Sequence, residues 1–456
     1  MGKLFFDTAL LPGGWADAVT IEVAADGVIA RVAAGSVPPP DATRAGIGLP
    51  GMPNLHSHAF QRGMAGLAEV AGDTPDSFWT WRQVMYGFLD KLTPDDVEAI
   101  AAQLYVEMLE AGFTSVAEFH YLHHAPDGSR YADCAEMAGR IAAASAASGI
   151  GLTLLPVLYA NGGFGGQTIQ AQQRRFASRD VEAFSILVDG ARKYAGMVAH
   201  ANVGIAPHSL RAVTPETLAA ALPLAAGGPI HIHAAEQTRE VDDCLVWSGQ
   251  RPVEWLLGHA EVDARWCLIH ATHMTPDETS RLARSGAIAG LCPQTEANLG
   301  DGIFDGAAYL SASGRFGIGT DSHIRVDLAE ELRTFEYGQR LRDRRRNVLG
   351  EAGNSTGRRL YGEALRGGAK ALGRACGALA EGQIADIVAL DHRHPILAGR
   401  AGDRCIDSWL FSGDGRCVQS VWAAGRQVVA EGRHVDASTI RARFAQTMQR
   451  LLSNST

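Results

Sequence analysis

Two histidines two residues apart, His56 and His58, are the feature of this chain best suited to chemistry. They follow a short apolar segment, residues 48–55, at the expected end of a strand. Side chains two residues apart in a strand point to the same face, so both imidazoles aim at one place. Imidazole nitrogen is the commonest protein ligand for metals such as zinc. The spacing predicts a divalent metal site, although an isolated H-x-H is weak evidence until other ligands accompany it.

Polar residues also stand at the ends of three later strand-like runs. These are His233 and Glu236 after the fifth run, His270 after the sixth, with His273 beyond it, and Asp321 after the eighth. A single histidine at a strand end is more often structural, and a single aspartate after Gly-Thr is usually a turn or a helix N-cap. Barrel enzymes, however, keep their chemistry at the carboxyl ends of parallel strands. The combination therefore predicts one catalytic site.

Composition limits the class of protein. The chain has 456 residues, is 46% hydrophobic and 20% charged, and carries a formal net charge of −9, which is typical of a globular protein. A negative net charge disfavours nonspecific binding to nucleic acid or anionic membrane. The seven cysteines are scattered, odd in number and without a C-x-x-C, which favours a reducing compartment. With no signal-peptide core in residues 1–7 and no apolar run long enough for a transmembrane helix, we expect a cytoplasmic protein.

Strand-like and helix-like runs alternate through the middle of the chain, which predicts parallel βα units. Helices are expected at 94–112 and 132–148, and a Gly-rich loop at 162–166 is expected to be a mobile lid or a plain turn. Eight βα units in about 325 residues suit a (β/α)₈ TIM barrel. The eight expected strands are 51–56, 115–121, 151–159, 203–207, 230–234, 267–271, 288–292 and 315–320.

Both ends of the chain contain short strand-like runs with Gly turns. They lie at 3–10, 19–25 and 28–33, and again at 383–390 and 418–429. The predicted organisation is an α/β protein with a small β domain built from both termini. Its parts would be residues 1–50 and 376–456, the second with a C-terminal helix, around a metal-dependent barrel at 51–375.

The order H-x-H, H-x-x-E, His, Asp resembles the amidohydrolase superfamily, and the resemblance covers essentially the whole chain. It implies that the terminal β pieces form that superfamily's composite β-sandwich. It also implies one metal held by His56, His58, His233 and Asp321. Three imidazoles and a carboxylate leave a coordination position for water, whose pKa the metal lowers toward neutrality. Glu236 would shuttle protons, His270 would contact that water, and Asp321 can accept its proton.

Lysine usage bears on the number of metals. Many superfamily members bridge two metals with a carboxylated lysine, but none of the four lysines here lies at an expected barrel strand end. These are Lys3, Lys91, Lys193 and Lys370. We therefore expect a single metal, zinc by default, with iron as an alternative because the same ligands bind either.

Further polar residues near strand ends suggest the substrate. Arg82, Tyr121, His208 and Arg211 would converge on one mouth, which suits a substrate with carboxylates because arginine binds carboxylate bidentately. The plainer interpretation of each arginine is a solvated surface or a salt bridge. Trp79 and Trp81 keep open an aromatic substrate.

The strings at 54–62, 233–237 and 319–323 resemble the formimidoylglutamate deiminase family, whose activity belongs to bacterial histidine degradation. The resemblance implies that Arg82, Tyr121, His208 and Arg211 bind the two carboxylates and that Gln61 lies near the formimino group. Water would attack the formimino carbon, Glu236 would protonate the leaving nitrogen, and ammonia would depart. A homodimer follows from the same resemblance.

Three alternatives stay open at this point. The first is a deaminase of a purine or another aromatic amine on the same single-metal site. The second is ring opening of the imidazolonepropionase type, which would release no ammonia. The third, a noncatalytic metal-dependent scaffold, is disfavoured because Glu236 would then serve no purpose, and because structural zinc sites close all four positions with protein ligands.

Overall fold

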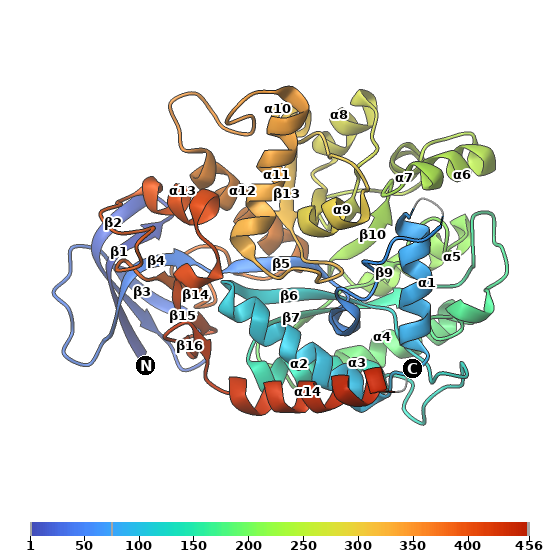
Figure 1. The fold of residues 1–456 in the computed structure, drawn as a ribbon, viewed down its shortest axis with the longest axis horizontal. Helices are drawn as coiled ribbons and strands as arrows, with labels where there is room; N and C mark the ends of the chain where they lie inside the picture. Colours follow the sequence, from blue (N-terminus) through green and yellow to red (C-terminus); the bar gives the residue numbers. More distant parts are fainter. Residues whose placement is uncertain (1, 74–75, 454–456) are drawn as a thin grey trace.

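The two ends of the chain meet in one eight-stranded sheet. The computed structural model describes residues 2–73 and 76–453 (Figure 1). The strand order is β17-β16-β15-β14-β4-β1-β2-β3. The strands are β1 (Gly2–Leu11), β2 (Gly14–Val23), β3 (Ile29–Ala33), β4 (Thr43–Pro50), β14 (Ile387–Leu390), β15 (Val418–Ala423), β16 (Arg426–Ala430) and β17 (Arg433–His434).

The junction between the two ends is the antiparallel pair β4–β14, in which Ile387 lies opposite Pro50. All the terminal strands expected from the sequence are present, the run at 418–429 as the hairpin β15–β16. Strand β4 was not expected, because its glycines and proline have low strand propensity; its pairing with β1 and β14 supplies the stability instead. The β-sandwich is not confirmed, since the described terminal strands form a single sheet.

A small apolar cluster belongs to this sheet. Phe6, Ile21 and Ile387 are fully buried in it, and the Phe6 ring meets the edge of Trp422 with ring centroids 5.9 Å apart. Alternate residues of these strands face this cluster, as the two-residue period of a strand requires. The two ends of the chain are therefore held together by these hydrophobic contacts as well as by the backbone hydrogen bonds of the sheet.

The middle of the chain forms two parallel sheets. One has the order β5-β6-β7-β8, with β9 also paired to β7, and the other has the order β10-β11-β12-β13. Their strands are β5 (Met52–Ser57), β6 (Phe113–His120), β7 (Gly151–Leu158), β8 (Asn202–Val203), β9 (Ala206–Pro207), β10 (Ile230–Ala234), β11 (Trp266–His270), β12 (Ile288–Leu291) and β13 (Arg315–Ile318).

All eight expected central strands are confirmed to within two residues at each end, the fourth as the two short pieces β8 and β9. Among the described residues, the backbone ladders of the two sheets meet only at single parallel bridges, such as Ser57 to Asp321 and Ile205 to Ile230. The described ladders therefore do not close into a continuous barrel. Because the strands are parallel, their carboxyl ends still lie at one edge, where the candidate site is found.

Helices surround these sheets (Figure 1). They are α1 (Phe78–Leu89), α2 (Pro94–Glu110), α3 (Glu136–Ser148), α4 (Val181–Ala195), α5 (Pro215–Ala221), α6 (Thr238–Ser248), α7 (Pro252–His259), α8 (Pro276–Ser285), α9 (Pro293–Leu299), α10 (Gly306–Ser311), α11 (Leu328–Asp343), α12 (Thr356–Leu372), α13 (Asp403–Ser412) and α14 (Ala437–Ser453). Among the described residues, no helix combines the length and the apolar composition that a bilayer crossing requires.

The expected helices are present. Thr93 is the N-cap of helix α2 and forms a capping box with Asp96, and Pro94 is the first helical residue. Helix α3 begins four residues later than expected, and the C-terminal helix α14 lies along α2 (Figure 1). An ion pair joins Arg441 to Glu110 at 2.7 Å, so α14 is held on α2 by charge as well as by apolar contacts.

The Gly-rich segment after β7 forms a turn, in which the Gly162 amide donates to the Gln167 carbonyl at 2.7 Å. Within it the ring of Phe164 stacks on Trp247 of α6 with centroids 5.5 Å apart. All seven cysteines lie in the described part of the chain, and each is a free thiol.

Candidate active site

A cavity lies at the carboxyl ends of the parallel strands, beside helix α1. Nearly every residue expected at the site lines it, and His56 lies directly behind the wall, fully buried. The expected residues that line it are His58, Gln61, Arg82, Tyr121, His208, Arg211, His233, Glu236, His270 and Asp321. Segments far apart in the sequence are thus brought to one place.

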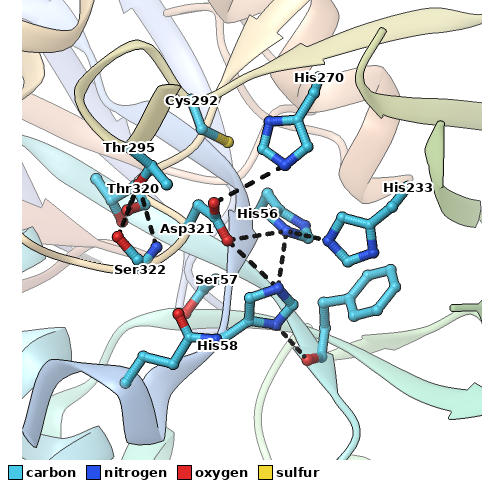
Figure 2. A network of polar contacts seen from close by, with 12 residues as sticks. His56, Ser57, His58, His233, His270, Cys292, Thr295, Thr320, Asp321 and Ser322 are labelled. Carbon is cyan, nitrogen blue, oxygen red and sulfur yellow. Dashed lines mark hydrogen bonds and ion pairs between the residues drawn. The ribbon is translucent and has the colours of Figure 1, made fainter. Parts of the chain in front are cut away.

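Three imidazoles converge on one point (Figure 2). The Nε2 atom of His56 lies 3.1 Å from Nε2 of His58 and 3.2 Å from Nε2 of His233. On the far side of the rings, Nδ1 of His58 donates to the Phe119 carbonyl at 3.0 Å, and Nδ1 of His233 donates to the His208 carbonyl at 2.9 Å. These carbonyls leave lone pairs on the facing Nε2 atoms. Such lone pairs repel unless a cation lies among them, so the donor set fits a divalent metal.

Burial keeps these three imidazoles neutral. It holds the pKa values of His56 and His233 well below the ordinary histidine value, and neighbouring imidazoles lower them further. The pKa of His58 is lowered by burial too, although the charge of Asp321 opposes the shift. Neutral imidazole is the form that binds a metal.

Asp321 completes this donor set from the loop after β13. Its Oδ1 atom lies 3.4 Å from Nε2 of His56 and 3.3 Å from Nε2 of His58 (Figure 2). The backbone of Asp321 is left-handed, with φ of 44°, a conformation that is uncommon for non-glycine residues. Two residues earlier, a Cβ at Gly319 would lie 2.8 Å from the backbone nitrogen and oxygen of His56. Only glycine therefore lets the Asp321 loop lie this close to β5.

A second group of possible ligand atoms, from His270, Cys292 and Asp321, is less suitable for a metal. Burial raises the pKa of the Cys292 thiol well above its ordinary value, so the thiol stays protonated. The thiolate is the form that binds metals. The three converging imidazoles with Asp321 are accordingly the better candidate.

His270 lies among three carboxylates. Its Nδ1 atom is 3.2 Å from Oε1 of Glu296, and its Nε2 atom is 3.8 Å from Oε1 of Glu236 and 3.9 Å from Oδ2 of Asp321. Burial lowers the pKa of His270, but the three carboxylates outweigh burial and raise it to about 10. Burial raises the pKa of Glu236 to about 7. A carboxyl group with a pKa near neutrality can both accept and donate a proton.

Two arginines line the opposite wall. Both guanidinium groups lie over the ring of Trp79, Arg82 at 5.3 Å and Arg211 at 5.8 Å from its centroid. The Arg211 side chain is only 12% exposed, and its nearest carboxylate oxygen, on Glu236, is 4.0 Å away. Its Nη1 atom is buried with no hydrogen-bond partner in the described chain. A buried, unsatisfied guanidinium nitrogen calls for an anionic acceptor.

Gln61 and His208 add neutral polar groups to the cavity. The Gln61 Nε2 atom donates to the Tyr121 hydroxyl at 2.8 Å, which leaves its Oε1 atom buried and unpaired among the described residues. Burial holds the pKa of His208 well below its ordinary value, so its ring is neutral. The cavity thus combines an unused acceptor on Gln61 with an unused donor on Arg211.

Beneath the imidazoles, Ser57 points the opposite way and anchors the H-x-H segment. Its hydroxyl donates to Glu118 at 2.5 Å, and the other Glu118 oxygen accepts from the Ala59 amide at 2.7 Å. The Tyr105 hydroxyl donates to Glu118 as well, at 3.1 Å. Glu118 thereby holds the backbone on both sides of His58.

Some polar residues near the site serve other purposes. Arg62 pairs with Glu107 at 2.8 Å, and His273 donates to the Asp301 carbonyl at 2.8 Å. None of the four lysines, all of which are described, lines the cavity.

Sequence reasoning missed several residues of the site. Tyr86, Tyr159 and Phe176 line the cavity, and Glu296 holds His270 from behind. Two signals were available. Tyr86 stands four residues after Arg82 on the same face of α1, and Tyr159 directly follows the end of β7. Nothing in the local sequence distinguishes Glu296 from a surface glutamate.

Comparison with known proteins identifies the family of this chain. Residues 47–428 match the Amidohydrolase family, and residues 1–46 match the N-terminal domain of Formimidoylglutamate deiminase HutF. The chain belongs to the amidohydrolase family. The superfamily resemblance inferred from the metal-ligand pattern is confirmed.

Individual relatives span the same length. A formimidoylglutamate deiminase of Pseudomonas aeruginosa is 53% identical over 99% of this chain and 100% of its own. The crystal structure of an amidohydrolase from Brucella melitensis is 49% identical, covers 99% of this chain and 100% of its own, and superposes with a TM-score of 0.95. An 8-oxoguanine deaminase of Pseudomonas aeruginosa is 30% identical over 74% of this chain and 73% of its own.

Proposed function

We propose that this amidohydrolase hydrolyses N-formimidoyl-L-glutamate to N-formyl-L-glutamate and ammonia, a step of histidine degradation. The observation that carries the proposal is the buried Nη1 atom of Arg211, which has no hydrogen-bond partner among the described residues. Arg211 lines the same cavity as Arg82, Glu236 and His270. An anionic substrate satisfies that atom. The relative that is 53% identical across the whole chain, a formimidoylglutamate deiminase, supports the same substrate.

The cavity's unused groups match the substrate's two ends. In this proposal Arg82, Arg211, His208 and Tyr121 bind the carboxylates. The unpaired Oε1 atom of Gln61 accepts an N–H of the formimino group. Fixing both ends holds the formimino carbon near Glu236, and such positioning can lower a reaction barrier by several kcal/mol.

The residues that would hold the metal are His56, His58, His233 and Asp321, and we propose one zinc ion, although iron binds the same donors. When bound, a divalent cation supplies Lewis acidity and lowers the pKa of water toward neutrality. The chain supplies three neutral imidazoles and one carboxylate, and backbone carbonyls already orient two of the imidazoles, those of His58 and His233. With no lysine lining the cavity, a single metal is the simplest arrangement.

Three side chains would manage the protons. Asp321 and Glu236 take the proton of the water that attacks the formimino carbon. His270, held between Glu236 and Asp321, stabilises the negative charge that develops on the attacking oxygen. Glu236 gives that proton to the imino nitrogen, which becomes an amino group. The second proton of the former water reaches the same nitrogen as the C=O bond forms, the C–N bond breaks, and ammonia leaves with N-formyl-L-glutamate as the other product.

At the level of architecture, we propose that the two parallel sheets act as one (β/α)₈ barrel, which the single bridges at Ser57–Asp321 and Ile205–Ile230 support. The domain limits 1–50, 51–375 and 376–456 are also proposed, and the change of matched family at residues 46 and 47 supports the first. A homodimer and a cytoplasmic location stay predictions, and light scattering on the purified protein tests the dimer.

A second candidate function is deamination of a purine or another aromatic amine. The aromatic lining of the cavity, Phe78, Trp81 and Phe176, favours it, as does the 30% identical 8-oxoguanine deaminase. The two arginines that line the cavity argue against a neutral heterocycle, because each would lose water without gaining an anion.

The decisive experiment measures ammonia release by the metal-replete enzyme from N-formimidoyl-L-glutamate, guanine, 8-oxoguanine and adenosine, with a chelator-treated control. We expect metal-dependent release from the formimino compound alone. Release only from the heterocycles would reject the proposal and establish the second candidate.

A further inference from the structure

Tyr159 lines the cavity but has no role in the chemistry described above. It directly follows β7, its side chain is buried, and its ring lies 4.7 Å from that of His208. Its hydroxyl oxygen is 2.9 Å from Nε2 of Gln173.

The hydrogen bonds of Gln173 determine which way the Tyr159 proton points. Gln173 is fully buried, and its Oε1 atom accepts the backbone N–H of Gln170 at 2.9 Å. That contact turns the amide NH₂ group toward Tyr159. An NH₂ group can only donate, so the Tyr159 oxygen must accept. The Tyr159 proton is then available, because the hydroxyl donates in no hydrogen bond among the described residues.

The surroundings of this hydroxyl are electropositive. Arg82 and Arg211 lie close enough to act on Tyr159 electrostatically, and Tyr86 is a second hydroxyl beside it. Burial raises the pKa of Tyr159 to about 12, so the hydroxyl keeps its proton at neutral pH. A protonated hydroxyl near two guanidinium groups favours an anionic oxygen of a ligand as the acceptor of its proton.

We propose that Tyr159 is a substrate-binding and specificity-determining residue, which donates its hydroxyl proton to one carboxylate of the substrate, and that Gln173 is its positioning residue. The inference rests on the proposed function and deepens it. Around this carboxylate the chain presents donors: two guanidinium groups and a hydroxyl whose proton is directed inward by Gln173. A carboxamide in the same place would turn an NH₂ donor toward those donors. The arrangement therefore selects a carboxylate over its neutral amide.

The test compares Tyr159→Phe with the native enzyme on three substrates, each assayed with metal-replete full-length protein. The substrates are N-formimidoyl-L-glutamate, N-formimidoyl-L-glutamine and N-formimidoyl-L-isoglutamine, so that each carboxylate is replaced by an amide in turn. For the dicarboxylate we expect kcat/KM to fall by roughly 10- to 100-fold, mostly through KM, the usual effect of losing a hydrogen bond to a charged group. For the substrate in which an amide replaces the carboxylate bound by Tyr159, we expect little change in kcat/KM. The ratio of kcat/KM for the dicarboxylate to kcat/KM for that amide should therefore fall by the same factor.

Gln173→Met provides an independent variant of similar volume. It should weaken selectivity for the carboxylate in the same direction, and the double variant Tyr159→Phe/Gln173→Met should lose no more than Tyr159→Phe alone. A purely structural role for Gln173 would instead lower activity on all three substrates equally. Tyr337→Phe, an exposed tyrosine on α11, is the matched control and should change nothing.

The outcomes separate the two proposals. If the native enzyme releases no ammonia from N-formimidoyl-L-glutamate, the proposed function fails and this inference with it. If the native enzyme is active while Tyr159→Phe and Gln173→Met both keep its selectivity for the dicarboxylate, only this inference fails. Should Tyr159→Phe not fold, the selectivity of Gln173→Met decides, supported by calorimetric binding of N-formyl-L-glutamate.

Discussion

The Oε1 atom of Glu296 lies 3.2 Å from Nδ1 of His270, on the side of the ring that faces away from the cavity. The same oxygen accepts the Cys292 amide at 2.9 Å, so the carboxylate is itself held in place. His270 also has a left-handed backbone, with φ of 67°. Glu296 therefore holds the orientation of the His270 ring and the direction of its Nε2 atom, which faces Glu236 and Asp321.

The first prediction concerns this contact. Glu296→Gln should lower kcat by about 10- to 100-fold with little change in KM, because partners behind a working histidine typically matter by that factor. Steady-state kinetics on N-formimidoyl-L-glutamate and metal analysis of the same sample check it. Gln294→Ala, at a partly buried neighbouring position on α9, is the control. An unchanged kcat for Glu296→Gln would show that His270 needs no orientation from behind.

Glu236→Ala should keep its metal and lose turnover. The carboxyl group is not part of the converging imidazole set, yet its pKa near 7 suits proton transfer. Metal content by mass spectrometry and single-turnover kinetics measure the two effects separately. Near-normal kcat in this variant would remove Glu236 from the proposed mechanism.

Arg211→Met should lower kcat/KM for the formimino substrate by roughly 100-fold or more, since a buried charge-assisted contact is worth several kcal/mol, while metal content stays native. Arg239→Met is the matched control. Arg239 also lies over Trp79, at 4.8 Å, but its side chain is 66% exposed and should contribute little. Equal losses in the two variants would point to packing on Trp79 rather than to carboxylate binding.

Gly319→Ala should reduce zinc affinity and lower stability by about 1–3 kcal/mol, the usual cost of overpacking. The new Cβ would meet the His56 backbone at 2.8 Å and push the Asp321 loop away from β5. Chelator competition and thermal unfolding measure the two consequences. Gly258→Ala on α7, where a Cβ would meet nothing within 4 Å, is the control and should be neutral or slightly stabilising. Native zinc affinity in Gly319→Ala would mean that the loop position is not needed for the ligand set.

His120 should make the fold sensitive to mild acid. Burial lowers the pKa of His120 to about 3, and its Nε2 atom has no hydrogen-bond partner in the described chain. Because an unfolded histidine titrates near 6.5, its contribution to stability is complete above about pH 6.5. It is lost progressively as the pH falls toward 3, by at most about 1.4 kcal/mol per pH unit.

Urea unfolding at pH 7.5, 6.0 and 5.0 tests this for the native chain and His120→Gln. The free energy of unfolding of the variant should fall less on acidification than that of the native chain. The difference should be at most about 1.4 kcal/mol per pH unit, the effect of one bound proton. Parallel curves for the two proteins would assign the acid sensitivity to other buried groups.

Much of this protein could be predicted from local sequence. The central strands were located because short apolar runs end in polar residues, and the metal ligands because H-x-H and H-x-x-E have fixed spacing within one strand end. Strand β4 was not predicted, because its glycines and proline have low strand propensity. It pairs with β14, whose residues lie more than three hundred positions away in the sequence. The joining of both ends of the chain in one sheet depends on the same long-range pairing.

The sequence by itself determined which side chains can bind a metal, move protons and meet carboxylates, since residue type and strand period are local properties. Only the tertiary structure decided how they act together. It placed Glu296 behind His270, left Arg211 Nη1 and Gln61 Oε1 without partners among the described residues, and paired the Tyr159 hydroxyl with Nε2 of Gln173. Those relationships depend on which distant loops pack against one another and on which polar groups they leave unsatisfied, and no local pattern of residues encodes them.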